Sequence, residues 1–218
     1  MKMIVISDSY FYRNAFSGVN DCITVSPDDV TLISREKSFD FYVNSVIVLS
    51  ISDKDIMLNV LAFVILQKAL AIFIEPVQWP SRARVFYTCN VFILPGKMRM
   101  EHLLTVIRKC LLSTSGVFRI SLERVKSSEW SAMLYLISGI SNRHLAQMLN
   151  ASEKTISGRI KSLAIKMGLS DLNKATQLNA MNLFYGIYIS RKSAEERNYF
   201  KKQQALVSES VRNWLVTV

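Results

Sequence analysis

Cysteine and histidine are scarce in this chain of 218 residues. The three cysteines, Cys22, Cys89 and Cys110, are far apart and form no CxxC pair, which argues against a disulfide framework and against a zinc site. The two histidines, His102 and His144, lie in stretches with helical periodicity and have no nucleophile or carboxylate at a readable spacing. The sequence therefore predicts neither an enzyme nor a metal site, and it implies no cofactor.

Long apolar runs are also few. The start, MKMIVISDSY, is too short an apolar run for a signal peptide and is typical of a β-strand instead. Residues 56–74 form a mostly apolar run of 19 residues, which Asn59, Gln67 and Lys68 interrupt. This run divides into a helix at about 55–68 and a strand at 71–74. We therefore expect a cytoplasmic protein with no membrane segment.

Positive charge is abundant, and most of it lies in the second half of the chain. The net charge is +10; residues 1–112 hold 12 Lys and Arg against 10 Asp and Glu, whereas residues 113–218 hold 15 against 7. Such an excess favours a polyanion as the partner. The alternative is a solvated basic surface that binds nothing.

The first 112 residues alternate between strand-like and helix-like runs. The predicted strands are Met3–Ser7, Cys22–Val25, Val46–Ile51, 71–74 and Val91–Leu94. The predicted helices are Tyr10–Val19, Pro27–Ser34, 55–68 and Met100–Leu112. An irregular stretch through Pro76 and Pro80 precedes the last strand. This alternation indicates βαβ units and a five-stranded, flavodoxin-like parallel sheet in a domain spanning 1–112.

Ligands of such sheets bind at the carboxyl ends of the strands, where this chain has Asp8, Ser50, Glu75 and Leu94. In element order, and in Pro95 after the last strand, this half resembles the receiver domain of response regulators. The resemblance fails in chemistry. Where that family has a second acid, a phosphoryl-accepting Asp, a Ser or Thr and a Lys, this chain has Ser7, Ser50, Glu75 and Leu94.

Mg²⁺-assisted phosphoryl transfer needs the carboxylates and the cation that are missing from this set. We therefore interpret the domain as a pseudo-receiver that is independent of phosphorylation and kept for dimerisation or for an unidentified signal. Asp8 is then expected to cap the following helix, and Glu75 to be a solvated loop acid.

Residues 113–121, STSGVFRIS, have the composition of a linker to a second domain at 122–189. That domain is predicted to open with an amphipathic helix at Glu129–Ile137, whose inward residues are Trp130, Met133, Leu134 and Ile137. Gly139 suits the position that ends this helix.

The stretch Ser141–Gly168 has the pattern of a helix-turn-helix. Ser141 can cap a short helix containing Leu145, Ala146 and Leu149, and Ser152 can cap a longer one. The inward stripe of the longer helix is Ile156, Ile160, Leu163 and Met167. Its other face carries donors for phosphate oxygens or base edges: Lys154, Thr155, Ser157, Arg159, Lys161, Ser162 and Lys166. The alternative is an ordinary solvated helix face.

This half resembles the four-helix DNA-binding domain of LuxR-type transcription regulators. The matching positions are Glu129, Gly139-Ile140-Ser141-Asn142, Leu145-Ala146, Ser152-Glu153-Lys154-Thr155-Ile156 and Lys166-Met167-Gly168. With the degenerate receiver in front, the whole chain is similar to the capsule-synthesis and fimbrial accessory regulators of enteric bacteria. The resemblance implies a bacterial, dimeric regulator that binds double-stranded DNA.

The chain departs from this family at the centre of the recognition helix. Ser157 stands where a Lys is common, and Gly158 follows it, at a cost of about 1 kcal/mol relative to Ala in a helix interior. Gly158 either admits a close approach to the DNA backbone or marks a weakened DNA reader. Arg159, in place of the usual His, preserves a phosphate contact.

A fourth helix is expected at Asp171–Ile189, and its inward residues would be Leu172, Ala175, Leu178 and Met181. This helix is either a dimer face, as the resemblance implies, or simply part of the core. Residues 190–218 predict an additional amphipathic helix with the stripe Phe200, Val207, Val211 and Trp214. We expect that helix to pack on its own chain or on a dimer partner rather than on a regulatory partner or a membrane surface.

The sequence is compatible with two functions. In the first, the chain is a transcription regulator that binds DNA as a dimer: Lys154, Ser157 and Lys161 approach base edges beside Gly158, while Thr155, Arg159 and Lys166 contact phosphates. In the second, it is an accessory protein that binds DNA poorly alone and acts as a heterodimer with another LuxR-type regulator.

Overall fold

The computed structural model describes residues 2–30, 41–76, 79, 84–113 and 115–191. The chain divides into two compact units, Met1–Arg119 and Ile120–Val218. The first is an α/β unit and the second, in its described part, is helical. The fold class predicted from the sequence is thus confirmed in both halves.

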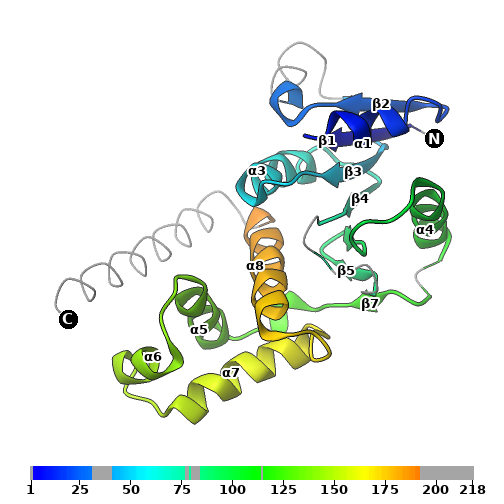
Figure 1. Ribbon diagram of the computed structural model, residues 1–218. Helices are drawn as coiled ribbons and strands as arrows, with labels where there is room; N and C mark the ends of the chain where they lie inside the picture. Colours follow the sequence, from blue (N-terminus) through cyan, green and yellow to red (C-terminus); the bar gives the residue numbers. More distant parts are fainter. Residues whose placement is uncertain (1, 31–40, 77–78, 80–83, 114, 192–218) are drawn as a thin grey trace. The chain divides into compact units, whose positions relative to one another are not determined.

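The first unit is built on a sheet whose seven described strands have the order β2-β1-β3-β4-β6-β5-β7 (Figure 1). These strands are β1 (Met3–Ser7), β2 (Cys22–Val25), β3 (Val46–Ser50), β4 (Ala71–Ile74), β5 (Phe86–Thr88), β6 (Val91–Ile93) and β7 (Phe118–Arg119). Neighbours among β2, β1, β3, β4 and β6 are parallel. These are the five strands that the sequence predicts, in the order of a flavodoxin-like sheet.

The sequence does not predict β5 and β7. Strand β5 pairs antiparallel with β6 through a tight turn at Cys89 and Asn90, which both have positive φ, 53° and 62°. Strand β7 pairs parallel with β5, and its two residues come from the segment 113–121 that the sequence assigns to the linker. The sheet therefore extends to Arg119, where the division between the two units lies.

The helices of the first unit begin where short polar side chains can cap them. Ser9 caps α1 (Tyr10–Ala15) and Asp53 caps α3 (Lys54–Ile65), whereas α4 (Met100–Leu112) has no side-chain cap. Helix α1 is shorter than its predicted range. Residues 27–30 are helical, and the remainder of the helix predicted at 27–34 lies outside the described residues.

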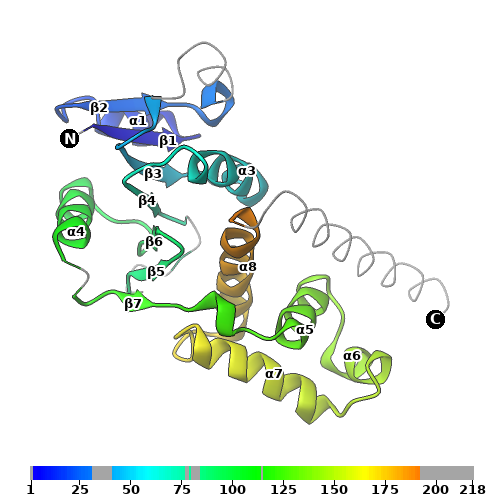
Figure 2. The same ribbon diagram turned by 180° about the vertical axis from the view of Figure 1, so that it is seen from behind.

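Alternate residues of the central strands pack on opposite sides of the sheet. On one side, Val5, Val48 and Phe73 share an apolar cluster with Leu103 and Ile107 of α4. Figures 1 and 2 show α3 on the other side of the strands from α4. Strands β1 and β3 are buried along their whole length, as their β-branched runs predict. Within the described ranges, no helix is both long and apolar enough to cross a membrane.

The second unit contains a short 3-10 turn, η2 (Leu122–Arg124), followed by α5 (Ser127–Ile137), α6 (Asn142–Met148), α7 (Glu153–Lys166) and α8 (Lys174–Ser190). Its core gathers Ala132 of α5, Leu145 and Ala146 of α6, and Ile156 of α7. Trp130 packs against Tyr185 of α8, with the ring centroids 5.1 Å apart. The four predicted helices of this domain are therefore present.

Helix α8 buries a different stripe from the predicted one. Met181 is buried, but Ala175 is exposed, and Leu172 and Leu178 are only half-buried. The buried residues lie further along the helix and include Phe184, Tyr185 and Ile187. Because α8 is apolar on several sides, its sequence is compatible with more than one inward stripe. The amphipathic helix predicted within 190–218 lies outside the described residues beyond Arg191.

Candidate nucleic-acid interface

Two serine caps set the geometry of the helix-turn-helix. The hydroxyl of Ser141 accepts a hydrogen bond from the backbone N–H of His144 at 3.3 Å and so begins α6. Ser152 accepts from the N–H of Thr155 at 3.1 Å and begins α7. Between the helices, Asn150 adopts a positive φ of 47°, which reverses the chain within a few residues. Both caps lie at the positions that the sequence predicts.

The inner face of α7 is apolar. Ile156, Leu163 and Met167 are fully buried, and Ile160 is half-buried. The side chains of Leu145 and Ala146 pack against this face from α6. The inward stripe fixes which residues of α7 can face the solvent.

The outer face of α7 presents Lys154, Thr155, Ser157, Gly158 and Lys161, all of them exposed. Arg159 is half-buried at the edge of this face. The Ser157 hydroxyl accepts a weak hydrogen bond from Nδ2 of Asn142 at 3.4 Å, which links the first residue of α6 to the outer face of α7. We call these six residues of α7, Lys154, Thr155, Ser157, Gly158, Arg159 and Lys161, the outer face.

Ser162 and Lys166 are not part of the outer face, although the sequence places them there. The Ser162 hydroxyl donates to Oε1 of Glu129 at 2.7 Å, and Lys166 Nζ lies 2.8 Å from Oε1 and 2.6 Å from Oε2 of the same carboxylate. Lys166 also donates to the carbonyl oxygen of Arg124 at 3.3 Å. Both side chains are therefore engaged within the domain, and we remove them from the candidate DNA contacts.

Glu129 is the centre of this network and is only 4% exposed. Besides Ser162 and Lys166, its carboxylate accepts from the backbone N–H of Lys126 at 2.8 Å, which caps the start of α5. One carboxylate thus joins the beginning of α5 to the end of α7. Burial alone would raise the pKa of Glu129, but the hydrogen bonds from Lys166, Lys126 and Ser162 and the charge of Lys166 hold that pKa below its ordinary value.

The lowered pKa predicts acid sensitivity of the second unit. Since the pKa of Glu129 is lower in the folded chain than in the unfolded chain, its stabilisation is complete above the unfolded value of about 4.3 and is lost as the pH falls through the folded value. A Glu129→Gln variant cannot ionise and should lack this component. Urea unfolding of both proteins across acidic pH measures the difference, which should shrink below about pH 4.3. A constant difference would contradict the prediction.

At the carboxyl ends of the strands in the first unit, Glu75 and Asp8 differ from expectation. Glu75 is 4% exposed rather than solvated; it accepts from the Tyr12 hydroxyl at 2.6 Å and from the N–H of Met98 at 3.0 Å. Asp8 accepts from the N–H of Ser52 at 2.8 Å, and Ser9 provides the helix cap instead. An acid at the end of a strand can therefore accept a hydrogen bond from the loop after a neighbouring strand, as Asp8 does, instead of capping the helix that follows it.

Tyr12 closes these strand ends from α1. Burial of its hydroxyl and the neighbouring Glu75 carboxylate raise the pKa of Tyr12, so the phenol keeps its proton and remains a donor. Ser50 and Leu94, the other two strand-end positions, are buried, Leu94 completely. The strand end at Glu75 is thus occupied by a hydrogen-bonded pair from the chain itself.

Tyr12→Phe is expected to lower the free energy of unfolding of the first unit by about 1–3 kcal/mol, because it leaves the buried Glu75 carboxylate short of a donor. Urea denaturation measures this change. The matched control is Tyr10→Phe on the same helix, where the ring is 64% exposed and the change should stay within about 0.5 kcal/mol. Equal effects of the two substitutions would contradict the prediction.

No protein-family model matches this chain, and no curated protein matches it. Among solved structures, two RcsB dimers bound to two parallel DNAs are similar to it at 19% sequence identity and a TM-score of 0.48, over 84% of this chain and 98% of that chain. A structure of the RcsB response regulator from Salmonella typhimurium is similar at 17% sequence identity and a TM-score of 0.38, over 84% of this chain and 100% of that chain. The response regulator ChrA of a heme-sensing two-component system is similar at 15% sequence identity and a TM-score of 0.31, over 85% of this chain and 98% of that chain.

Proposed function

We propose that this chain is a DNA-binding transcription regulator that places α7 in the major groove. One observation carries the proposal: the cations of the outer face have no acidic partner among the residues that the structure describes. In the described ranges, no acidic side chain pairs with Lys154, Arg159 or Lys161, whereas the neighbouring Lys166 is held by Glu129. A helix that is buried on one side and carries unpaired cations on the other suits a polyanionic groove.

The positions of the outer-face residues on α7 suggest two kinds of DNA contact. Lys154, Ser157 and Lys161 are exposed and follow one another at helical spacing, so we assign them to base edges. Thr155, in the first turn, and Arg159, at the edge of the face, suit phosphate oxygens. Base contacts would confer sequence preference, and phosphate contacts would fix the orientation of the helix.

We further propose that the regulator acts as a dimer and that its activity does not depend on phosphorylation. The second statement is supported by Ser50, a hydroxyl where receivers have a carboxylate, and by the engagement of Glu75 with Tyr12. For the first, the exposed Ala175 of α8 offers apolar surface to a second chain. Light scattering after size-exclusion chromatography tests it; a monomer at all concentrations, with and without DNA, would contradict dimer action.

A salt titration tests the proposed function. The full chain is mixed with a fluorescein-labelled duplex, and anisotropy is recorded at rising KCl concentration. Contacts with several phosphates predict that the logarithm of the affinity falls linearly with the logarithm of salt, with a slope of about −0.9 per phosphate neutralised. Absence of binding at low salt, or binding that salt does not weaken, would contradict the proposal.

Gly158 favours a second candidate, an accessory protein that binds DNA weakly alone and pairs with another LuxR-type regulator. A Cβ added at Gly158 would meet nothing within 4 Å, so packing within the domain does not require glycine here. A glycine in an exposed helix interior makes α7 easier to unwind. Weak binding by the isolated chain, restored by mixing with a partner regulator, would support this candidate.

Gly158→Ala is expected to raise the free energy of unfolding of the second unit by about 1 kcal/mol, since the helix gains and nothing clashes. Its effect on DNA affinity separates the two roles of the glycine. A loss of affinity means that the backbone approaches the DNA closely, and a gain means that glycine weakens the reader. Lower stability would contradict the expected helical benefit.

A further inference from the structure

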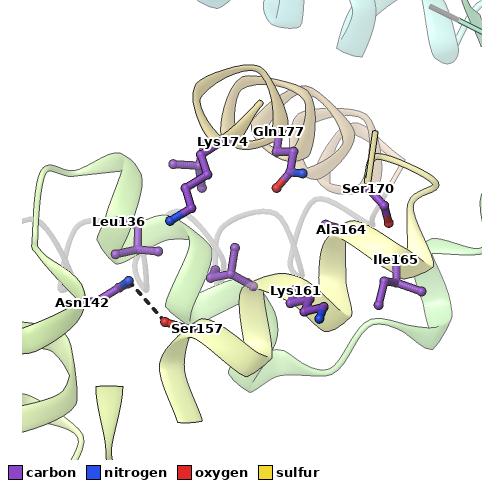
Figure 3. A pocket seen from close by; sticks show the side chains of 11 residues that line it. Leu136, Asn142, Ser157, Lys161, Ala164, Ile165, Ser170, Lys174 and Gln177 are labelled. Atoms are coloured by element: carbon purple, nitrogen blue, oxygen red, sulfur yellow. Dashed lines mark hydrogen bonds between the residues drawn. The ribbon is translucent and has the colours of Figure 1, made fainter. Parts of the chain in front are cut away.

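A groove opens beside the outer face, between α7 and the beginning of α8 (Figure 3). Its volume is about 800 Å³, within the range of small-molecule sites. The last turn of α5 and the first residue of α6 complete its walls, so every lining residue belongs to the second unit. Two of its lining residues, Ser157 and Lys161, also belong to the outer face.

Five of the eleven residues that line the groove are aliphatic. Leu136 comes from α5, Ile160, Ala164 and Ile165 from α7, and Leu178 from α8. Ile165 is 57% exposed. An occupant with an aliphatic body would remove this surface from water.

The charge of the groove has one sign. Lys161 on α7 and Lys174 on α8 line it from two helices, and no Asp or Glu is among its lining residues. In the described part of the chain neither amine has an acidic partner. Figure 3 shows the Lys174 side chain extending from α8 in the direction of Asn142. An occupant therefore needs a negative charge as well as an apolar body.

The walls of the groove are held by the domain's own hydrogen bonds. Gln177 Nε2 donates to the carbonyl oxygens of Leu169 and Leu172, at 3.1 and 2.8 Å, which fixes the connection between α7 and α8. At the other end, Asn142 bonds to Ser157. A preformed site loses less conformational entropy when a ligand binds.

We propose that this groove binds an amphipathic organic anion, with its alkyl or ring body on the aliphatic wall and its carboxylate held by Lys174. Because Ser157 and Lys161 also belong to the outer face, the anion and DNA compete for the same surface. The proposal of a binding site depends only on the groove and its lining residues. The competition rests on the proposed DNA-binding function.

Calorimetry on the full chain with decanoate, below its micellar concentration, tests the site. Decanoate should bind, whereas acetate, which lacks the chain, and decylammonium, which reverses the charge, should not. Lys174→Gln should weaken decanoate binding by about threefold to tenfold, the contribution of a partly exposed charge-assisted contact. The matched control is Lys154→Gln, which removes a charge from α7 outside the groove and should leave decanoate binding unchanged.

The two variants also separate the two proposals. Lys174→Gln should retain DNA binding, Lys154→Gln should lose part of it, and saturating decanoate should weaken DNA binding by the wild type. Absence of decanoate binding in a chain that binds DNA overturns the groove proposal alone. Equal binding of decanoate and decylammonium overturns it too. If a second copy of the chain covered the groove, decanoate binding would weaken as the protein concentration rises. That result would also overturn the groove proposal.

Discussion

Glu129→Ala is expected to lower the free energy of unfolding of the second unit by about 3 kcal/mol, the lower end of the cost of breaking a buried ion pair. The carboxylate is almost inaccessible and serves three donors. Removing it leaves the N–H of Lys126 without its cap and the Ser162 hydroxyl without an acceptor. Lys166 can partly rehydrate because its side chain is 30% exposed, which limits the loss.

Urea unfolding of the full chain measures this effect in a Trp79→Phe, Trp214→Phe background. Tryptophan fluorescence then comes from Trp130 alone, whose ring packs on Tyr185 in the second unit. Glu123→Ala is the matched control: it removes an exposed acid only six residues away and should change stability by less than about 0.5 kcal/mol. If Glu129→Ala behaved like this control, the network between α5 and α7 would not stabilise the domain.

The double substitution Arg159→Gln and Lys161→Gln is expected to weaken DNA binding about 100-fold. It should also make the slope of log affinity against log salt shallower by about 0.9, the contribution of one phosphate, because Arg159 is assigned to a phosphate and Lys161 to a base edge. Both side chains lie on α7, and neither has an acidic partner within the described residues. Neither is fully buried, so the fold should tolerate the change. Anisotropy with a labelled duplex measures affinity and slope together.

The control for this variant is Arg108→Gln with Lys109→Gln on α4. It removes the same charge from exposed positions of the first unit. In the control, only the general electrostatic attraction between a basic protein and DNA should fall. The loss of DNA affinity should therefore be much smaller than the loss caused by removing direct contacts. Equal losses in both double variants would mean that net charge, and not the outer face, determines binding.

Local patterns in the sequence predicted the elements whose signals are regular. Helix α4 begins and ends at the predicted residues, Met100 and Leu112, and the serine caps of α6 and α7 lie where they were expected. The parallel strands were readable because their runs are apolar and bounded. Strands β5 and β7 were not, since they have only three and two residues, and the turn before β6 uses Cys89 at positive φ instead of glycine.

Long-range polar partners were the least predictable features. Tyr12 and Glu75 are 63 residues apart, and Glu129 and Lys166 are 37 apart, so no local pattern signals either pair. Ser162 and Lys166 lie at the borders of the apolar stripe of α7, next to Leu163 and Met167, where periodicity alone does not decide which way a side chain turns. The buried carboxylate of Glu129 determines the orientation of both side chains, because it accepts hydrogen bonds from Ser162 and Lys166.

This division changes the description of α7. The sequence offered seven donors on one face; two of them belong to the scaffold, and the remaining polar face lies closer to the N-terminal end of the helix. In helix-turn-helix proteins that end contacts the bases. The scaffold formed by Glu129 and the proposed contact surface formed by the outer face can therefore be tested separately.

Mapping amide chemical shifts of the full chain during titration with a DNA duplex tests the central claim most directly. The account predicts that the largest changes fall on the residues of the outer face, at Lys154, Ser157 and Lys161, while the strands of the first unit stay unchanged. Changes centred on α4 or on the strands, with the outer face unaffected, would contradict it.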